Sequence, residues 1–471
     1  MVQGCDLATE LIDHIFTYLI DDNETCAAGT LVSSQWHFSA RRALFHTIVL
    51  YQDDISTLGA DGIKTLCSPP ANTAQLVKKL YLTCPAVTTY QLDHILSIFP
   101  NVHIFTLLRT KLMLLPDEFK LVEGWKLPRN IQSLRLHGVT YYMHNWSSKA
   151  PSDDNEFKYW APGPRENTDA FETQIPQSSL VQFLNLFSDI STLSLYEVTP
   201  GGLGDQGAWL LSCGRWPVDY SWYYRPTFRS ALWAEGQRLS SRFTVKAIMA
   251  SERMIRGSFS GAEIALSIIA YSPSAMSQLR HLDIAEQPTV TSELLRRAAP
   301  TLTHLRMQLL MLLEELLPSK SIDSFGFDRC KSLTDLDIAL CIEDGTLRFI
   351  DGAHVSGEDL RRQHFRQFLR LISISAKTFR HFTLRLRCFE TFLARYDWEA
   401  MDTLLGTCHA LTDVCLLFGV YMGYGRDDVE KGEALTLDAI KERVRTKLVC
   451  LREKLGDRLQ ISLQYCKRDA R

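Results

Sequence analysis

A short apolar pattern returns many times along the 471-residue chain. It reads apolar-x-x-apolar-x-apolar, which is typical of a short buried strand. The copies occupy residues 77–82, 102–107, 131–136, 190–195, 279–284, 302–307, 333–338, 379–384 and 411–416. The fourth position advances by 25, 29, 59, 89, 23, 31, 46 and 32 residues, and most steps are close to one, two or three units of about 30. The spacing therefore predicts a repeated structural unit.

Helix-like segments precede most copies of this pattern. The clearest occupy residues 89–99, 179–187, 291–298, 364–372 and 398–405. A helix followed by a short strand, when repeated, builds a parallel sheet with helices on one side. The expected fold class is therefore α/β, built of alternating helices and short parallel strands. A generic α/β domain with the same elements is the alternative to a repeat array.

Composition limits the partners and the cellular compartments that are expected for the chain. Hydrophobic residues make up 46%, charged residues 22%, and the formal net charge is −3, so no bulk charge attracts nucleic acid or an anionic membrane. The twelve cysteines are scattered without a C-x-x-C pair, which indicates reduced thiols in the cytosol or the nucleus. We expect no signal peptide, because acidic residues interrupt the first apolar run, and no membrane span.

Motifs for catalysis or cofactor binding are few. Residues 202–207 read GLGDQG and satisfy G-x-G-x-x-G, but glycine and proline stop the helix that a dinucleotide site needs after the glycines. No nucleophile elbow, zinc-protease helix or phosphate-binding lysine motif is present, and the histidines show no metal spacing with cysteine. His281, His304 and His381 share one repeat position, so we expect them at the surface. The sequence predicts a non-catalytic protein with no cofactor and no metal site.

The N-terminal residues predict a small helical module. Residues 6–20 carry an apolar stripe at Leu7, Leu11, Ile15 and Leu19, with acidic residues in the first turn. A second helix is expected at about 25–32 and a third at 39–45. Residues 46–51 read HTIVLY and predict a strand that leaves the module.

The order of residues in this module resembles the F-box, in particular the N-terminal F-boxes of large families in mushroom-forming fungi. The resemblance rests on Leu7, Glu10, Leu11, Ile12, Ile15, Leu19, Leu31, Val32, Ser33, Trp36, Arg41, Leu44, Phe45 and Ile48. Where the family has Leu-Pro, this chain has Leu7-Ala8. The resemblance implies that the module binds the adaptor subunit that links F-box proteins to a cullin. The residues that it assigns to adaptor binding are Leu7, Ala8, Glu10, Leu11, Ile15, Leu19, Leu31 and Trp36.

The rest of the chain resembles the irregular leucine-rich repeats that often follow an F-box. The repeat family places Asn or Cys in the turn after each strand, and only Cys341 matches, so the turns must be closed in another way. The domains expected are an F-box at 1–50, a linker or cap at 51–75, and a substrate-binding array at 76–471. Insertions interrupt the array at about 141–178 and 200–243; the second is rich in aromatic residues, a composition common in binding hot spots.

These resemblances imply a substrate-recruiting subunit of a cullin-RING ubiquitin ligase, which acts without catalysis of its own. Its partners would be the adaptor, through it a cullin, and an unknown protein substrate. The candidate substrate-binding residues are Arg135, His304, Arg306, His381, Arg385, Arg387, Trp216 and Trp222. One alternative is a leucine-rich-repeat scaffold with no ligase link, in which the helices only cap the array and bury Leu7, Leu11 and Ile15. Another is an α/β enzyme with a site at 202–207.

Overall fold

A computed structural model gives the fold of this protein. It describes residues 7–51, 73–113, 128–142, 178–201, 226–251, 261–286, 292–309, 327–341, 348–350, 353–355, 365–366, 368–374, 378–389, 396–421 and 437–466. The chain divides into two compact units, Met1–Phe243 and Thr244–Arg471.

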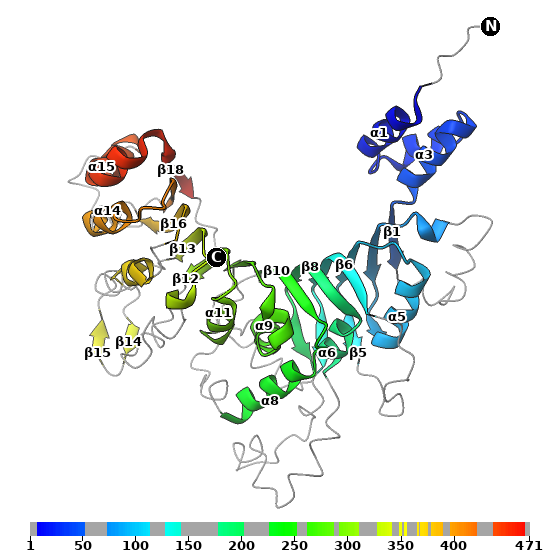
Figure 1. Cartoon of the computed structure of the whole chain (residues 1–471), viewed down its shortest axis with the longest axis horizontal. Helices are drawn as coiled ribbons and strands as arrows, with labels where there is room; N and C mark the ends of the chain where they lie inside the picture. The colour runs from blue at the N-terminus through cyan, green and yellow to red at the C-terminus, as the bar shows by residue number, and fades with distance from the viewer. Residues whose placement is uncertain are drawn as a thin grey trace, which may run out of the picture. The chain divides into compact units, whose positions relative to one another are not determined.

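The first unit begins with a three-helix module (Figure 1). Its helices are α1 (Thr9–Tyr18), α2 (Asn23–Gly29) and α3 (Ser34–Leu44). They enclose a small core of Ile12, Phe16, Cys26, Ala40 and Ala43. Helix α3 starts five residues before the predicted position, because the Ser33 side chain accepts a hydrogen bond from the Trp36 backbone N–H and so caps the helix.

A parallel sheet follows the module in the first unit. Its strands lie side by side in the order in which they occur along the chain. They are β1 (Thr47–Tyr51), β2 (Lys79–Thr83), β4 (Ile104–Leu108), β6 (Arg129–His137) and β8 (Phe187–Tyr196). Strand β1 is the strand predicted at 46–51, and it pairs with β2 directly after α3.

A second, narrower parallel sheet accompanies the first. It consists of the short strands β3 (Ala86–Thr88), β5 (Lys111–Met113), β7 (Thr140–Tyr142) and β9 (Thr199–Gly201). Each follows a strand of the main sheet after a tight turn, and the sequence pattern did not predict them. The described helical elements beside these sheets are η1 (Thr73–Gln75), α5 (Thr89–Ile98), α6 (Ser179–Leu184) and α8 (Pro226–Gln237).

Three of the four turns between the two sheets share one backbone conformation, and the β2–β3 turn does not. Arg109, Gly138 and Glu197 each follow a long strand and have positive φ angles of 47°, 65° and 51°. The Arg109 N–H donates to the carbonyl of His137 at 2.7 Å, and the Gly138 N–H donates to the carbonyl of Tyr196 at 2.8 Å. Backbone groups of neighbouring turns thus form hydrogen bonds with one another. These bonds take the place of the Asn or Cys side chains that leucine-rich repeats have in such turns and that these three turns lack.

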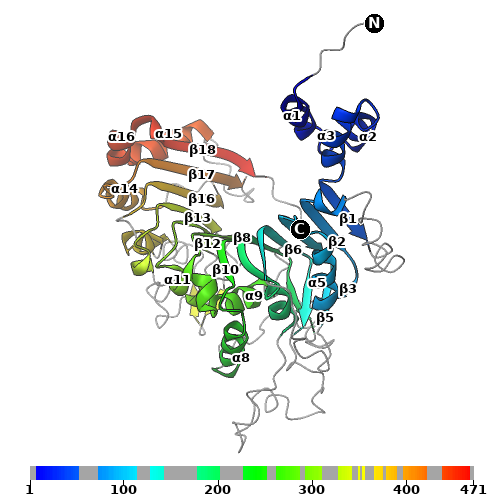
Figure 2. The same ribbon diagram turned by 45° about the vertical axis from the view of Figure 1, so that its right-hand side comes forward.

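The second unit contains a parallel sheet in which the strands also follow chain order (Figure 2). Its strands are β10 (Thr244–Ser251), β11 (His281–Glu286), β12 (His304–Leu309), β13 (Asp335–Cys341), β16 (His381–Phe389), β17 (Asp413–Tyr421) and β18 (Leu459–Cys466). Its labelled helical elements are α9 (Gly261–Ala270), α10 (Pro273–Ser277), α11 (Ser292–Ala298), η6 (Phe327–Arg329), α14 (Trp398–Gly406), α15 (Leu437–Lys447), α16 (Val449–Leu455) and η8 (Gly456–Arg458). Residues 365–366 and 368–374 are helical as well. A separate antiparallel pair joins β14 (Arg348–Ile350) and β15 (Ala353–Val355).

The core in each unit lies between one face of the sheet and the helices. On β4, Phe105 and Leu107 are fully buried, and the Phe105 ring lies 6.4 Å from that of Phe183 on α6. On β17, Phe418 packs against Trp398 of α14 with 5.5 Å between ring centroids. The intervening strand residues point to the other face of the sheet, which we call the open face.

All nine predicted strands are strands of these parallel sheets, and the predicted α/β alternation is confirmed. The five predicted helices correspond to α5, α6, α11, α14 and helical residues at 365–366 and 368–374. Strand β10 was not predicted. Among the described helices, none has the length and apolar content needed to span a membrane.

Residues 441–455 read KERVRTKLVCLREKL, a pattern that predicts one continuous C-terminal helix. The structure divides it into α15 and α16, with Leu448 between them. The Asp402 carboxylate of α14 accepts hydrogen bonds from the backbone N–H groups of Cys450 and Leu451, and so caps the start of α16. The break therefore depends on a tertiary contact, which local sequence does not show.

Candidate functional site

Helix α1 carries apolar residues on two sides. Ile12 and Phe16 point into the three-helix core. Leu7 lies two residues before the helix, and Leu11 and Ile15 lie one turn apart on it; the three are exposed by 41%, 53% and 39%, respectively. We call these three residues the α1 stripe. An apolar stripe that the protein's own core does not cover is typical of a surface that binds another protein.

Polar contacts fix helix α1 on α3. The Asp13 carboxylate accepts a hydrogen bond from the Ser39 hydroxyl at 2.5 Å and pairs with the Arg42 guanidinium at 3.0 Å. The Gln35 side chain donates to the carbonyl of Leu7 at 2.7 Å. The helix is thus anchored on the side away from the α1 stripe.

The other residues assigned to the adaptor fall into two groups. Ala8 and Glu10 are exposed at the start of α1, and Leu31 is exposed after α2. Leu19 and Trp36 pack partly against the module core, where the Trp36 ring meets Phe16 edge-on at 5.6 Å. Their first role is to support the fold of the module.

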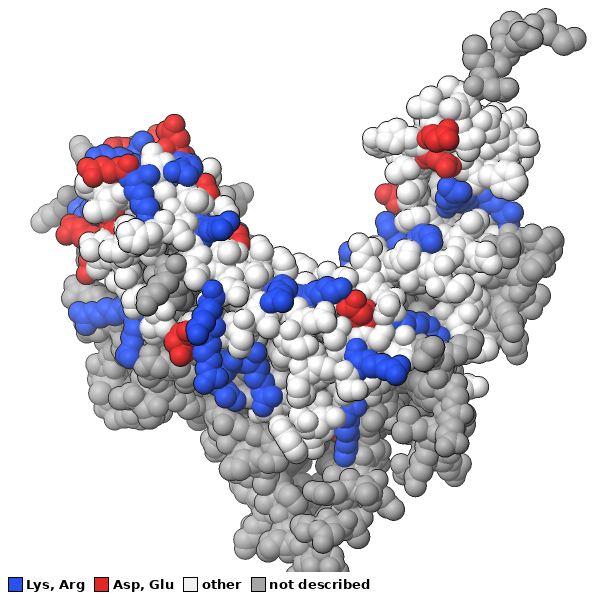
Figure 3. Space-filling model, viewed as in Figure 1, with Lys and Arg blue, Asp and Glu red and all other residues white. Residues whose placement is uncertain are grey.

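Three exposed apolar residues of the module were not among the predicted site residues. They are Tyr18, Val32 and Phe38. Tyr18 lies three residues after Ile15 and extends the α1 stripe by one turn, a spacing visible in the sequence. Most of the visible surface of the module carries no Lys, Arg, Asp or Glu (Figure 3). The face of the module seen in this view is therefore weakly charged.

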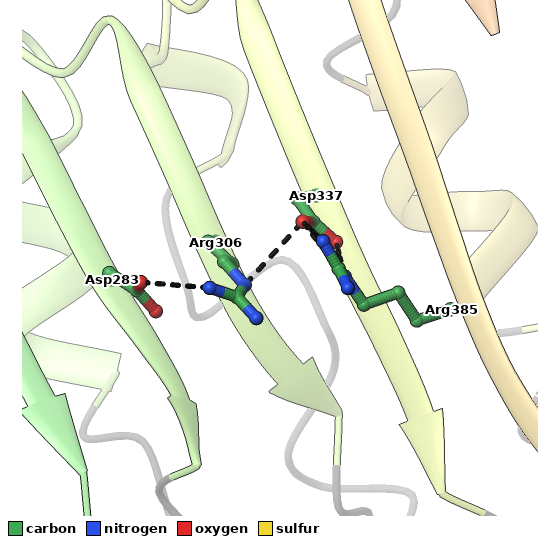
Figure 4. A network of polar contacts seen from close by, with 4 residues as sticks. All are labelled: Asp283, Arg306, Asp337 and Arg385. Carbon is green, nitrogen blue, oxygen red and sulfur yellow. Dashed lines mark hydrogen bonds and ion pairs between the residues drawn. The ribbon is translucent and has the colours of Figure 1, made fainter. Parts of the chain in front are cut away.

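The open face of the sheet in the second unit is different, because charged residues line it. Arg306 of β12 lies between Asp283 of β11 and Asp337 of β13, at 3.2 Å and 3.5 Å (Figure 4). Arg385 of β16 donates from Nε and one terminal nitrogen to Asp337 at 2.8–3.0 Å. This bidentate hydrogen bonding raises the pKa of Arg385. Both arginines are already bound to carboxylates, so neither is free to receive a phosphate or a carboxylate from a ligand.

Histidines and aspartates form a row at the start of the same strands. The rings of His281 and His304 stack at 4.0 Å, and His304 Nε2 lies 3.0 Å from Asp335. His381 Nδ1 lies 2.9 Å from Asp413. Two of the three histidines predicted to share a repeat position are therefore direct neighbours, while β13 separates His304 from His381.

In this row of histidines and aspartates, His281 and Asp413 have lowered pKa values. His281 is exposed, but partial desolvation of its ring lowers its pKa, and the nearby His304 adds to that effect. The hydrogen bond from the Thr412 hydroxyl lowers the pKa of Asp413, and His381 adds to it. No group of three metal-ligating side chains occurs in the described part of the chain.

The six cysteines whose side chains are described are poor nucleophiles. Burial raises the pKa of the Cys330 thiol to about 12 and raises the pKa of Cys26, Cys84, Cys408 and Cys415. The hydrogen bond with Asp402 raises the pKa of Cys450. A thiol needs a lowered pKa to act as a nucleophile near neutral pH, so these six give no support to a thiol enzyme.

The remaining predicted residues are separate from these groups. Arg135 lies on the open face of β6, in the first unit. Arg387 belongs to β16, but its side chain lies outside the description. Trp216, Trp222 and the 202–207 motif all fall outside the described residues.

Comparisons with known proteins add no assignment. No protein-family model matches the chain, and no curated protein matches it significantly.

Proposed function

We propose that this protein is the substrate-recruiting F-box subunit of a cullin-RING ubiquitin ligase, in the cytosol or the nucleus. The observation that carries the proposal is the α1 stripe. A module that only capped the array would bury Leu7, Leu11 and Ile15, yet all three are exposed while Ile12 and Phe16 complete the core of the module. Exposed apolar side chains on a helix with its own core favour a partner protein.

The region after the module supports the proposal that this protein recruits a substrate. In each unit the main sheet has its strands in chain order, and described helices or 3-10 turns lie between most pairs of successive strands. This order is what an irregular leucine-rich array produces, because each repeat contacts its neighbours in sequence. The three turns with positive φ add a structural repeat that the amino acids themselves do not show. An array of this kind offers its open face to a protein substrate.

The mechanism follows from tethering and needs no catalytic residue. The α1 stripe and Leu31 bind the adaptor, and the open face of the array holds the substrate. The ligase then carries its ubiquitin-charged enzyme close to the substrate, whose effective local concentration rises. The protein thus contributes proximity and selection.

Adaptor binding tests the proposal. The full chain is mixed with purified adaptor, and binding is measured for the parent and for Leu11→Asp. Burying a carboxylate in an apolar interface is costly, so we expect at least a tenfold loss of affinity, equivalent to about 1.4 kcal/mol. Val449→Asp is the matched control, because Val449 is 42% exposed on α16, far along the chain from the module. Absence of adaptor binding by the parent protein, or equal binding by Leu11→Asp, contradicts the proposal.

One observation favours the scaffold alternative. Helix α3 leads directly into β1, and the His46 carbonyl accepts hydrogen bonds from the backbone N–H groups of Lys78 and Lys79. The module is therefore built onto the first strands of the sheet, as a cap would be. Affinity capture with and without residues 1–50 separates the two functions. The ligase subunit loses adaptor and cullin on truncation and keeps its substrate, whereas a scaffold captures neither ligase component.

A further inference from the structure

Strand β4 carries a buried hydroxyl group at Thr106. Thr106 is only 4% exposed, and its Oγ1 atom has no hydrogen-bond partner. Its neighbours Phe105 and Leu107 point into the core, so Thr106 points to the open face of the sheet in the first unit. An unpaired buried hydroxyl costs about 1–3 kcal/mol, which favours a role for it with a bound group.

Arg135 is the residue paired with Thr106 across the sheet. Register places Thr106 of β4 and Ser194 of β8 on either side of Arg135 on β6. The next open-face positions on these two strands are Ile104 and Leu108, and Thr192 and Tyr196. None of them is acidic. The Arg135 Nε atom donates to the Ser133 hydroxyl at 3.2 Å, and within the described chain the guanidinium forms no ion pair.

Open-face arginines of the second unit have different partners from Arg135. Arg306 and Arg385 also lie on an open face, but aspartates on adjacent strands bind both of them. At Arg135 the corresponding neighbours are hydroxyl residues. Hydroxyl groups and one guanidinium can donate hydrogen bonds to an anion without competing for it.

We propose that Arg135 binds a carboxylate from an acidic segment of a partner protein, with the Thr106 hydroxyl as an additional donor. A single guanidinium matches the two oxygens of a carboxylate, whereas a phosphate dianion generally needs more positive charge than this site holds. The inference deepens the proposed function and rests on it, since it assigns a chemistry to the substrate of the array. The candidate substrates are proteins with exposed Asp- or Glu-rich segments.

Peptide binding to the full-length protein tests the assignment. Fluorescence polarisation is measured with three labelled peptides of Gly and Ser that differ in one respect: the first contains Glu, the second Gln and the third phosphoserine at the same positions. The parent protein is expected to bind the Glu peptide more tightly than the other two. Arg135→Gln is expected to lower the affinity for the Glu peptide about 10- to 100-fold. Arg443→Gln, at an exposed site on α15, removes the same charge elsewhere and should leave it unchanged.

Thr106→Val provides a second readout. It keeps the shape of the side chain and removes the unpaired hydroxyl, so the melting temperature is expected to rise or stay constant. Binding of the Glu peptide is expected to weaken about 3- to 10-fold. A residue with a merely structural role would not combine unchanged or higher stability with weaker binding.

The outcomes are distinguishable. Failure of the Glu peptide to bind, equal binding by Arg135→Gln, or tighter binding of the phosphoserine peptide overturns the carboxylate assignment. Adaptor binding is measured on the same protein samples. Loss of the peptide result with normal adaptor binding rejects only this inference, while absence of adaptor binding rejects the proposed function.

Discussion

A Cβ atom added to Gly29 would lie 2.5 Å from the Cζ atom of Phe16. Gly29 of α2 therefore allows the Phe16 ring of α1 to fill the core of the module, with Ala40 of α3 on the other side at 3.1 Å. We predict that Gly29→Ala destabilises the module by about 1–3 kcal/mol, because overpacking forces the ring out of its position. Limited proteolysis within residues 1–50 measures the effect. Ala28→Ser, at an exposed position of the same helix, should behave like the parent.

Ala8 is the position where the F-box family has proline. Its φ angle of −57° already suits a proline ring, and it stands at the N-cap, where the helix needs no N–H from it. We predict that Ala8→Pro folds normally and is more stable by about 0.4–1 kcal/mol, because the unfolded chain loses freedom. Thermal unfolding checks the stability, and the adaptor assay checks whether affinity rises. A lower melting temperature would show that proline does not fit this site.

Two helices of the second unit cap each other through Asp402 and Lys454. Asp402 of α14 binds the first N–H groups of α16, and Lys454 of α16 donates to the carbonyls of Gly406 and Cys408. Asp402 is only 4% exposed, so its loss leaves the N–H groups of Cys450 and Leu451 without an acceptor. Asp402→Ala is expected to lower the free energy of unfolding by about 1–3 kcal/mol. Asp438→Ala, at an exposed site on α15, is the control in urea denaturation.

The three turns with positive φ respond to substitution in opposite directions. Gly138 tolerates its angle without strain, so Gly138→Ala is expected to cost about 1–2 kcal/mol. Arg109 and Glu197 hold the same conformation with a side chain. Glycine relieves that strain but increases the freedom of the unfolded chain, so Arg109→Gly should be neutral or slightly stabilising. Equal losses at Gly138 and Arg109 would show that the turns are not equivalent.

The main strands were predictable because their burial alternates in a simple way. The apolar-x-x-apolar-x-apolar copies fall on strands whose second and third apolar residues face the core, as Leu305 and Met307 do on β12. The short second sheet was not predictable, because three residues such as Lys111–Met113 carry no periodic signal. The break at Leu448 depends on Asp402, which is remote in sequence.

The sequence likewise predicted some features of the candidate sites and not others. The α1 stripe was visible in sequence because a helix with two apolar sides must leave one of them outside a small core. Sequence could not show whether Arg135, Arg306 and Arg385 were free or paired. That difference depends on whether the neighbouring strand presents a serine, as at Ser194, or an aspartate, as at Asp337. Register between strands sets this, and register is a property of the fold.

Acidification is expected to destabilise the second unit through His281. Partial desolvation lowers the pKa of His281 below its ordinary value of 6.5, and the stacked His304 adds to the shift, while Asp335 opposes it. The unfolded chain therefore takes up a proton more readily than the folded chain as the pH falls. The contribution of His281 to the free energy of unfolding is constant well above pH 6.5 and decreases as the pH drops through 6.5 toward the folded pKa.

Urea denaturation at about pH 7.5 and about pH 5.5 measures this dependence. His281→Gln removes the titrating ring, so the difference in unfolding free energy between the two conditions should shrink. Some dependence should remain, because burial also lowers the pKa of His46, in the first unit. His409→Gln, at an exposed turn after α14, is the control and should retain the dependence of the parent. A pH dependence that is unchanged in His281→Gln would show that the stacked pair does not couple protonation to folding.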